Sequence, residues 1–275
     1  KNRTCGFALL HSSDWVTDQK SKFCRMSAAV AGNVDDEQRA RDDLAFSYRQ
    51  LASMSMNEGV CNHLTQALPG NESFLVISHG VAWDRCQPSD LCLVNALGEV
   101  LGCGPGRPEV TAVCIHAAVH KSLGYGRATC VFHTHMPNAT ALSCLLPDRG
   151  GRVLPIHQNA CRFMPSVTSY DDKFNGLGNS ETEGDRIAST IEDGARVLFM
   201  GNHGVMVVGG SCAECFDDLY FLERTCANQV LALSAAGGDV AALRYITPKV
   251  ARATHAAFET DRVEYARRHF RSLRE

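Results

Sequence analysis

Hydrophobic and polar positions alternate along this chain with two different periods. Apolar residues that recur at helical spacing between charged ones predict amphipathic helices. Short apolar runs bounded by Gly, Pro, Asn and Asp predict strands. The helical pattern covers residues 34–56, 110–123, 137–146, 184–193 and 211–235. The strand pattern covers residues 60–67, 74–78, 90–101, 129–135, 153–156 and 195–209, with turns inside 90–101 and 195–209.

The order of these elements bears on the domain organisation. Strands and helices are mixed throughout the sequence, without a repeat, a low-complexity tract or a clear linker. A sheet with helices on both faces accommodates this mixture. We therefore expect one domain over residues 1–275, with a core at about 40–235 and further helices within 240–275. Residues 161–182 are polar and rich in Gly, Asn and Asp, which predicts a long irregular loop of the kind that often carries function.

Composition and charge exclude several classes of partner. The chain is 45% hydrophobic and 21% charged, with a net charge of −3, as is ordinary for a globular domain. There is no block of like charges, so we expect no nucleic-acid partner and no anionic membrane surface. No apolar run approaches the roughly 20 residues of a membrane helix.

The number and the positions of the cysteines indicate a reducing cellular compartment. There are 13 of them, an odd number, and most lie inside apolar segments, where a free Cys behaves as a small buried hydrophobe. A secreted disulfide framework is typical of much shorter chains. We therefore predict free thiols and a cytoplasmic location, in which the sequons at Asn71 and Asn138 have no meaning.

Two separate histidine signals carry the strongest chemical prediction. His133 and His135 lie in VFHTH, and His203 lies in FMGNHGVMVV, at what the pattern predicts to be strand ends. Residues i and i+2 of a strand point to the same face, so His133 and His135 can bind one ion together. A third imidazole from His203 would complete a catalytic type of zinc site with one open position. Iron, cobalt and manganese stay open as alternatives, as does an ordinary polar strand end.

Other motifs favour plainer interpretations. His116 and His120 share one helix face, but Ala117 follows His116, so the HExxH pattern of metalloproteases is absent and ordinary hydrogen bonds are favoured. Cys212 and Cys215 form a single CxxC, which chance explains in a chain so rich in cysteine. The chain lacks the glycine-rich nucleotide motifs and the GxSxG nucleophile elbow.

An ordered set of segments resembles the class II aldolase/adducin superfamily over about residues 40–235. The segments resemble its adducin-head branch more than its sugar-phosphate aldolases. The matching segments, in family order, are CNHLT (61–65), FLVISHG (74–80), LCLVNALGEVL (91–101), IHAAVH (115–120), CVFHTHMPNATALS (130–143) and VLFMGNHGVMVVG (197–209).

The resemblance implies a fold and a chemistry. The fold is a three-layer α/β/α sandwich with a central, mainly antiparallel sheet. His133, His135 and His203 take the zinc-ligand positions of fuculose-phosphate aldolase and its relatives, in which the metal chelates two substrate oxygens and stabilises an enediolate. The family usually forms tetramers with sites near subunit interfaces, so the resemblance implies a homo-oligomer.

The chain departs from the aldolases at the acid/base position. Their Glu lies four residues before the helix histidine that matches His116, and this chain has Ala112 there. Glu109, three residues earlier, is the one carboxylate candidate for moving protons.

This chain also differs from the family at the positions of the substrate pocket. Asn62 matches the family's Asn, Gly80 keeps the Gly of its Thr-Gly turn, and Thr111 keeps one hydroxyl of its Ser-Ser pair. Tyr170, in the predicted long loop, lies near the position of the family's mobile catalytic Tyr.

These observations predict a metal-dependent lyase that acts on a small hydroxy-carbonyl, sugar-phosphate or keto-acid substrate. Two alternatives stay open. One is a non-catalytic, adducin-like assembly module that retains the histidines as a relic. The other is an epimerase or dehydratase on the same scaffold.

Overall fold

In the part of the chain that the structure describes, eight strands pair into one sheet in the order β4-β3-β2-β1-β5-β8-β7-β6. The computed structural model describes residues 34–70, 72–95, 97–102 and 104–275. Every strand pairing is antiparallel except that of β6 with β7. The strands are β1 (His63–Leu68), β2 (Ser73–Ile77), β3 (Leu91–Asn95), β4 (Val100–Gly102), β5 (Cys130–Thr134), β6 (Thr168–Asp171), β7 (Val197–Met200) and β8 (Gly204–Gly209).

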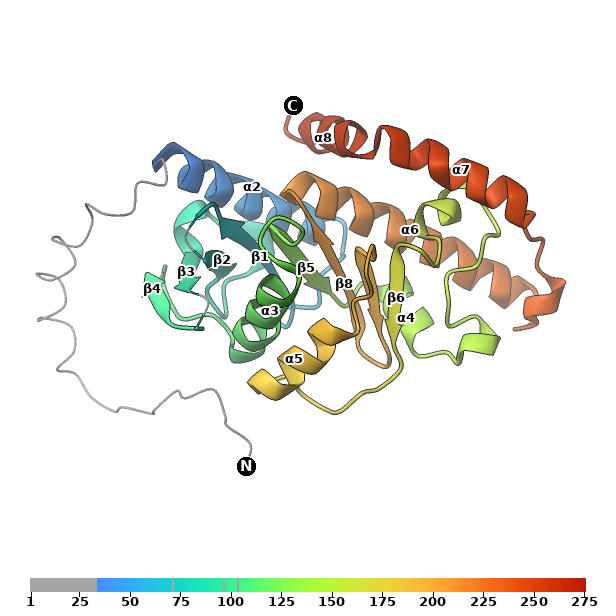
Figure 1. Cartoon of the computed structure of the whole chain (residues 1–275), viewed down its shortest axis with the longest axis horizontal. Helices are drawn as coiled ribbons and strands as arrows, with labels where there is room; N and C mark the ends of the chain where they lie inside the picture. Colours follow the sequence, from blue (N-terminus) through green and yellow to red (C-terminus); the bar gives the residue numbers. More distant parts are fainter. Residues whose placement is uncertain (1–33, 71, 96, 103) are drawn as a thin grey trace, which may run out of the picture.

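Helices cover both faces of this sheet (Figure 1). Helices α3 and α5 pack against each other on one face, and α2 and α6 lie on the other, with α8 outside α6. This is the predicted three-layer α/β/α arrangement. The helices are α2 (Val34–Ser53), α3 (Val110–Leu123), α4 (Pro137–Ser143), α5 (Glu181–Ser189), α6 (Cys212–Ala235), α7 (Pro248–Thr260) and α8 (Arg262–Ser272).

Hydrophobic clusters on opposite faces of the sheet follow from the alternation of side chains along the strands. In β5, Phe132 belongs to the core under α2 and α6, and its neighbour Val131 belongs to the core under α3 and α5. In β8, Val207 and Val208 divide in the same way. A sheet that is buried on both faces explains the continuous apolar runs at residues 130–132 of β5 and 205–208 of β8.

The structure corrects some predicted boundaries. Residues 153–156 form no strand, although Leu154 N donates to Gln229 Oε1 of α6 at 2.8 Å. The segment 161–182 is not wholly irregular, because it contains β6 and the end of a short 3-10 helix (Gln158–Phe163). Helix α4 ends at Ser143 rather than at residue 146. Residues 1–33 and Asn71, on which part of the domain prediction and one sequon fall, lie outside the described residues.

The described cysteines agree with the prediction of free thiols. Ten cysteines lie within the described residues, and eight of these are buried. Cys212 and Cys215 lie in the first turn of α6 beneath the sheet, with Cys212 Sγ 3.7 Å from Cys130 Sγ. Burial raises the pKa of the Cys215 thiol well above its ordinary value, which disfavours the reactive thiolate.

Candidate metal centre and cavity

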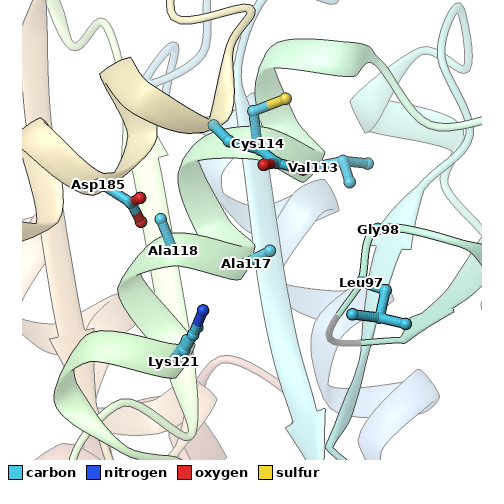
Figure 2. A pocket seen from close by; sticks show the side chains of 9 residues that line it. Leu97, Gly98, Val113, Cys114, Ala117, Ala118, Lys121 and Asp185 are labelled. Atoms are coloured by element: carbon cyan, nitrogen blue, oxygen red, sulfur yellow. The ribbon is translucent and has the colours of Figure 1, made fainter. Parts of the chain in front are cut away.

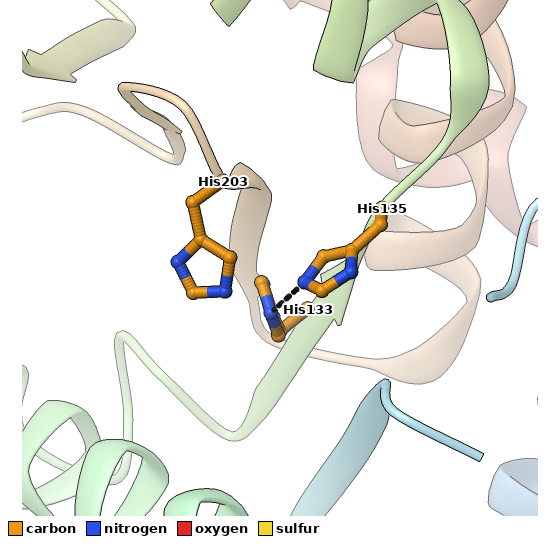
Figure 3. A group of neighbouring side chains, drawn as sticks. All are labelled: His133, His135 and His203. Atoms are coloured by element: carbon orange, nitrogen blue, oxygen red, sulfur yellow. Dashed lines mark hydrogen bonds between the residues drawn. The ribbon is translucent and has the colours of Figure 1, made fainter. Parts of the chain in front are cut away.

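The imidazoles of His133, His135 and His203 converge at one end of the sheet (Figure 3). Their candidate ligand nitrogens all lie within 4.8 Å of one another. His133 lies in β5, His135 follows the end of that strand, and His203 lies in the turn between β7 and β8. Because β5 pairs with β8, the His203 turn is brought beside the end of β5. Pairing of distant strands thus brings together histidines that the sequence separates.

Two backbone features let the turn and strand approach so closely. Asn202 adopts the left-handed conformation, with φ of 56°, which is tolerated by Asn better than by most residues. A Cβ on Gly204 would lie 2.7 Å from Thr134 O and 2.8 Å from His135 Cδ2. Only glycine therefore fits at this position without displacing His135.

Hydrogen bonds determine which nitrogen each ligand histidine presents. His133 Nδ1 donates to the carbonyl of Val205 at 2.9 Å, and His135 Nδ1 donates to the Glu58 carboxylate at 2.6 Å. Each neutral ring then carries its lone pair on Nε2. The two Nε2 atoms face each other at 3.1 Å. Two nitrogens bound to one tetrahedral zinc lie about 3.3 Å apart, so this pair fits a metal.

The protonation of these rings also suits a metal, which binds only neutral imidazole. Burial, followed by the neighbouring histidines, lowers the pKa of His133 well below its ordinary value. Burial also lowers the pKa of His203 to about 4. Both rings are therefore neutral at physiological pH.

A cavity of about 490 Å³ opens beside the three histidines. Glu109 and Thr111 reach its wall from the N-terminus of α3, and Glu58 and His63 reach it from the segment around the start of β1. Phe174 and Leu177, both exposed, form an apolar side from the segment before α5. The cavity thus combines the candidate ligands with a carboxylate, a hydroxyl and an apolar wall.

Glu109 and Thr111 lie together at the start of α3. Glu109 is the N-cap residue, and its Oε2 accepts from Ala112 N at 3.2 Å and from the Thr111 hydroxyl. Its Oε1 has no hydrogen-bond partner among the described residues. Ala112 is fully buried in the core between α3 and the sheet, so the carboxylate at this helix end comes from Glu109.

Asn62 and Gly80 lie beside the cavity without forming its wall. The buried Asn62 Oδ1 accepts from Glu58 N at 2.7 Å and from His135 N at 3.3 Å, so Asn62 positions two residues of the site. Its Nδ2 is buried without a hydrogen-bond partner among the described residues. Gly80 lies in an exposed turn with φ of +87°, and its neighbour His79 lines the cavity in its place.

Tyr170 has a different position from the one predicted. It lies in β6 rather than in a loop, and it is not among the residues that line the cavity. Its ring stacks on Phe199 at 5.3 Å, and its hydroxyl accepts from Val153 N at 3.1 Å. Burial raises the pKa of Tyr170 to about 12. These contacts anchor the edge of the sheet.

A second cavity, of about 190 Å³, lies between α3 and the turn that joins β3 to β4 (Figure 2). Lys121 and Asp185 lie at its rim among small apolar side chains. No site residue predicted from the sequence lines it. The cavity beside the histidines is therefore the candidate functional site.

Sequence reasoning missed two residues of this site, Glu58 and His63. Glu58 lies in a segment without a recognisable motif, and only the folded structure brings it to His135. His63 follows Asn62 directly and pairs with His133 across β1 and β5. The sequence shows that His63 adjoins the predicted site residue Asn62. It does not show that β1 pairs with β5, which brings His63 to His133.

Comparison with known proteins identifies the family. The profile described as "Class II Aldolase and Adducin N-terminal domain" matches residues 42–230. A protein of Caulobacter vibrioides with the name "Putative aldolase class 2 protein" is 31% identical over 214 residues, which are 77% of this chain and 80% of that protein. Human beta-adducin is 32% identical over 171 residues, which are 61% of this chain and 22% of that protein.

A solved structure gives the same result. The L-fuculose 1-phosphate aldolase of Glaciozyma antarctica superposes with a TM-score of 0.72 and 25% identity, covering 86% of this chain and 89% of that one. The chain belongs to the class II aldolase and adducin family, as the resemblance of its motifs predicted. Within the described residues, no helix has both the length and the apolar character needed to cross a bilayer.

Proposed function

We propose that this chain is a metal-dependent lyase of the class II aldolase type, with His133, His135 and His203 as ligands to zinc or another divalent transition metal. The observation that carries the proposal is the facing pair of Nε2 atoms, 3.1 Å apart, on His133 and His135. Two lone pairs repel each other at this distance unless a cation or an added proton lies between them. Burial of His133 disfavours the added proton, so a metal ion is the better occupant.

The proposed substrate is a small hydroxy-carbonyl, sugar-phosphate or keto-acid compound. When bound, the metal would supply Lewis-acid stabilisation to negative charge on the substrate oxygens. Glu109 would transfer a proton to or from the substrate, because its Oε1 is free and its carboxylate lines the same cavity. Thr111 holds Glu109 in place through its hydroxyl. Phe174 and Leu177 would exclude water from one side of the substrate.

Metal analysis of the purified full chain tests the site. We expect near-stoichiometric metal in the wild type and loss of that metal in the His133→Ala/His135→Ala double variant. Retro-aldol, decarboxylation and epimerisation assays on sugar phosphates and keto acids then identify the reaction. A wild type that binds no zinc, with the same melting temperature in chelator, would contradict the proposal.

The adducin-like assembly module is the second candidate. The replacement of the family's acid/base Glu by Ala112 favours it, because the buried methyl group cannot transfer a proton. The two candidates differ in an observable way, since an assembly module would show no turnover with any substrate of the screen even when loaded with metal.

We also propose that the chain is a cytoplasmic homotetramer. Free, mainly buried cysteines support a reducing compartment, and the family likeness supports an oligomer. Light scattering on the eluted protein measures the subunit number, and a monomer at micromolar concentration would contradict the tetramer.

A further inference from the structure

A chain of buried hydrogen bonds runs from the cavity into the core beneath it. His63 Nδ1 lies 2.8 Å from His116 Nε2, and His116 Nδ1 lies 2.7 Å from Thr65 Oγ1. Thr65 Oγ1 lies 2.9 Å from His120 Nε2, and His120 Nδ1 lies 2.6 Å from the carbonyl of Ala128. All the side chains of this relay are at least 97% buried. We call these residues, from His63 to Ala128, the histidine relay.

The carbonyl of Ala128 determines the direction of every bond in the relay. A carbonyl only accepts, so His120 donates from Nδ1. A neutral His120 then has its lone pair on Nε2 and needs a donor, which is the Thr65 hydroxyl. Donation from Thr65 to the carbonyl of Val131, 3.3 Å away, would instead leave two lone pairs facing each other.

The same reasoning continues toward the cavity. Because its one proton goes to His120, Thr65 Oγ1 accepts from His116 Nδ1. His116 then has its lone pair on Nε2 and accepts from His63 Nδ1. A neutral His63 therefore carries its own lone pair on Nε2, because the hydrogen bonds in the core, and not contacts with solvent, determine its tautomer.

Burial supports neutral rings throughout the relay. No carboxylate among the described residues is hydrogen-bonded to His63, His116 or His120. Burial lowers the pKa of His120 to about 4 and that of His116 well below its ordinary value. At neutral pH each ring thus carries one proton.

His63 borders the candidate metal centre without belonging to it. Its ring centroid lies 5.0 Å from that of His133, and the ring lines the cavity. The group of close ligand atoms contains His133, His135 and His203 but not His63. His63 Nε2 has no hydrogen-bond partner among the described residues. It is therefore an acceptor beside the ligands.

We propose that His63 Nε2 accepts a hydrogen bond from a hydroxyl group of the substrate, and that the histidine relay fixes this polarity from the core. The inference rests on the proposed function and narrows it, because it selects a hydroxylated carbonyl compound over a simple keto acid. A nitrogen that accepts but cannot donate forms a hydrogen bond with a substrate hydroxyl, and it forms none with a carbonyl oxygen at the same place. His63 is then a specificity-determining residue, and Thr65, His116 and His120 are positioning residues.

Two probes that differ by one hydroxyl test the substrate contact. Acetohydroxamate chelates a metal through two oxygens, and glycolohydroxamate does the same while adding a hydroxyl on the neighbouring carbon. On the zinc-loaded full chain, calorimetry should give about five- to tenfold tighter binding for glycolohydroxamate, as one added hydrogen bond provides. His63→Leu should abolish this preference, so that the two probes bind with about equal affinity.

Conservative variants separate the contact from a structural effect. In His63→Gln, the amide can donate to His116 and accept from the ligand, so the preference for glycolohydroxamate should be retained. Thr65→Val leaves His63 in place but removes the hydroxyl of the relay, so the preference should fall. Equal affinities of the two probes for the wild type, or an undiminished preference in folded His63→Leu, would overturn the inference.

The tautomers can be measured without any metal. Long-range proton–nitrogen correlation spectra of the histidine-labelled, zinc-free chain should show protonated Nδ1 and unprotonated Nε2 for His63, His116 and His120. In Thr65→Val, His63 and His116 should lose this single tautomer. Protonation of His63 at Nε2 in the wild type would overturn the inference even if zinc binds. If neither hydroxamate binds, the proposed function fails and the substrate contact fails with it, whereas the spectra still decide the relay.

Discussion

His133 Nε2 and His135 Nε2 lie 3.1 Å apart, and the other nitrogen of each ring donates a hydrogen bond to a group that can only accept one. Val205 supplies a backbone carbonyl to His133, and Glu58 supplies a carboxylate to His135. Groups behind the ligands orient them and raise their basicity. The candidate metal centre therefore depends on residues that never touch the metal.

Glu58→Gln should weaken metal binding without unfolding the chain. The amide oxygen can still accept from His135 Nδ1, but it lacks the negative charge that makes the ring a better ligand. We expect a loss of about 10- to 100-fold in zinc affinity, measured by competition with a chromogenic chelator. The exposed Glu192→Gln is the matched control and should bind zinc as the wild type does. Equal affinities of the two variants would rule out this role for Glu58.

Gly204→Ala should disturb both folding and the metal centre. The added Cβ would meet Thr134 O at 2.7 Å and His135 Cδ2 at 2.8 Å, so the turn or the ring must move. We expect a loss of about 1–3 kcal/mol in the free energy of unfolding and weaker zinc binding. In the control Gly126→Ala, the added Cβ meets no atom within 4 Å, so neither quantity should change appreciably.

Glu109→Gln should separate catalysis from metal binding. The amide can still accept the hydrogen bonds that cap α3, but it cannot take up a proton. For whichever reaction the substrate screen detects, we expect kcat to fall by about 100-fold or more, with the zinc content unchanged. Glu181→Gln, in the second cavity, is the control. Full activity in Glu109→Gln would exclude this carboxylate as the acid/base group.

Acidification should destabilise the metal-free protein well above the range in which carboxylates titrate. Burial lowers the pKa of His63 to about 3 and that of His120 to about 4, whereas an unfolded histidine has a pKa of about 6.5. Between these values the unfolded chain binds more protons, so the stability present above pH 6.5 is lost as the pH falls toward 4.

Each of these two histidines should cost on the order of 1–2 kcal/mol of stability at pH 5. Urea denaturation in the presence of chelator, at pH 7 and at pH 5, measures the difference. The midpoint should move to lower urea at pH 5. An unchanged midpoint would show that the buried rings take up protons without cost, contrary to their neutral state in the relay.

The relay also shows how a plain interpretation of a motif can be correct and incomplete. The sequence favoured ordinary hydrogen bonds for His116 and His120, and the structure confirms them. What the sequence could not show is that Thr65 joins the two rings and that His63 continues the chain to the cavity. Thr65 and His63 belong to β1, which is more than fifty positions away from His120 in the chain.

The amino-acid sequence by itself determined the local part of this protein. Strand periodicity put His133 and His135 on one face, and the ordered motifs identified the family and its three-layer fold. The tertiary structure alone decided how distant groups meet: Glu58 behind His135, His63 beside His133, Glu109 in the wall of the cavity beside the histidines, and Tyr170 in an edge strand away from that cavity. The physical reason is that spacing along a helix or strand follows from backbone geometry, whereas contacts between elements depend on strand pairing and packing that no local pattern encodes.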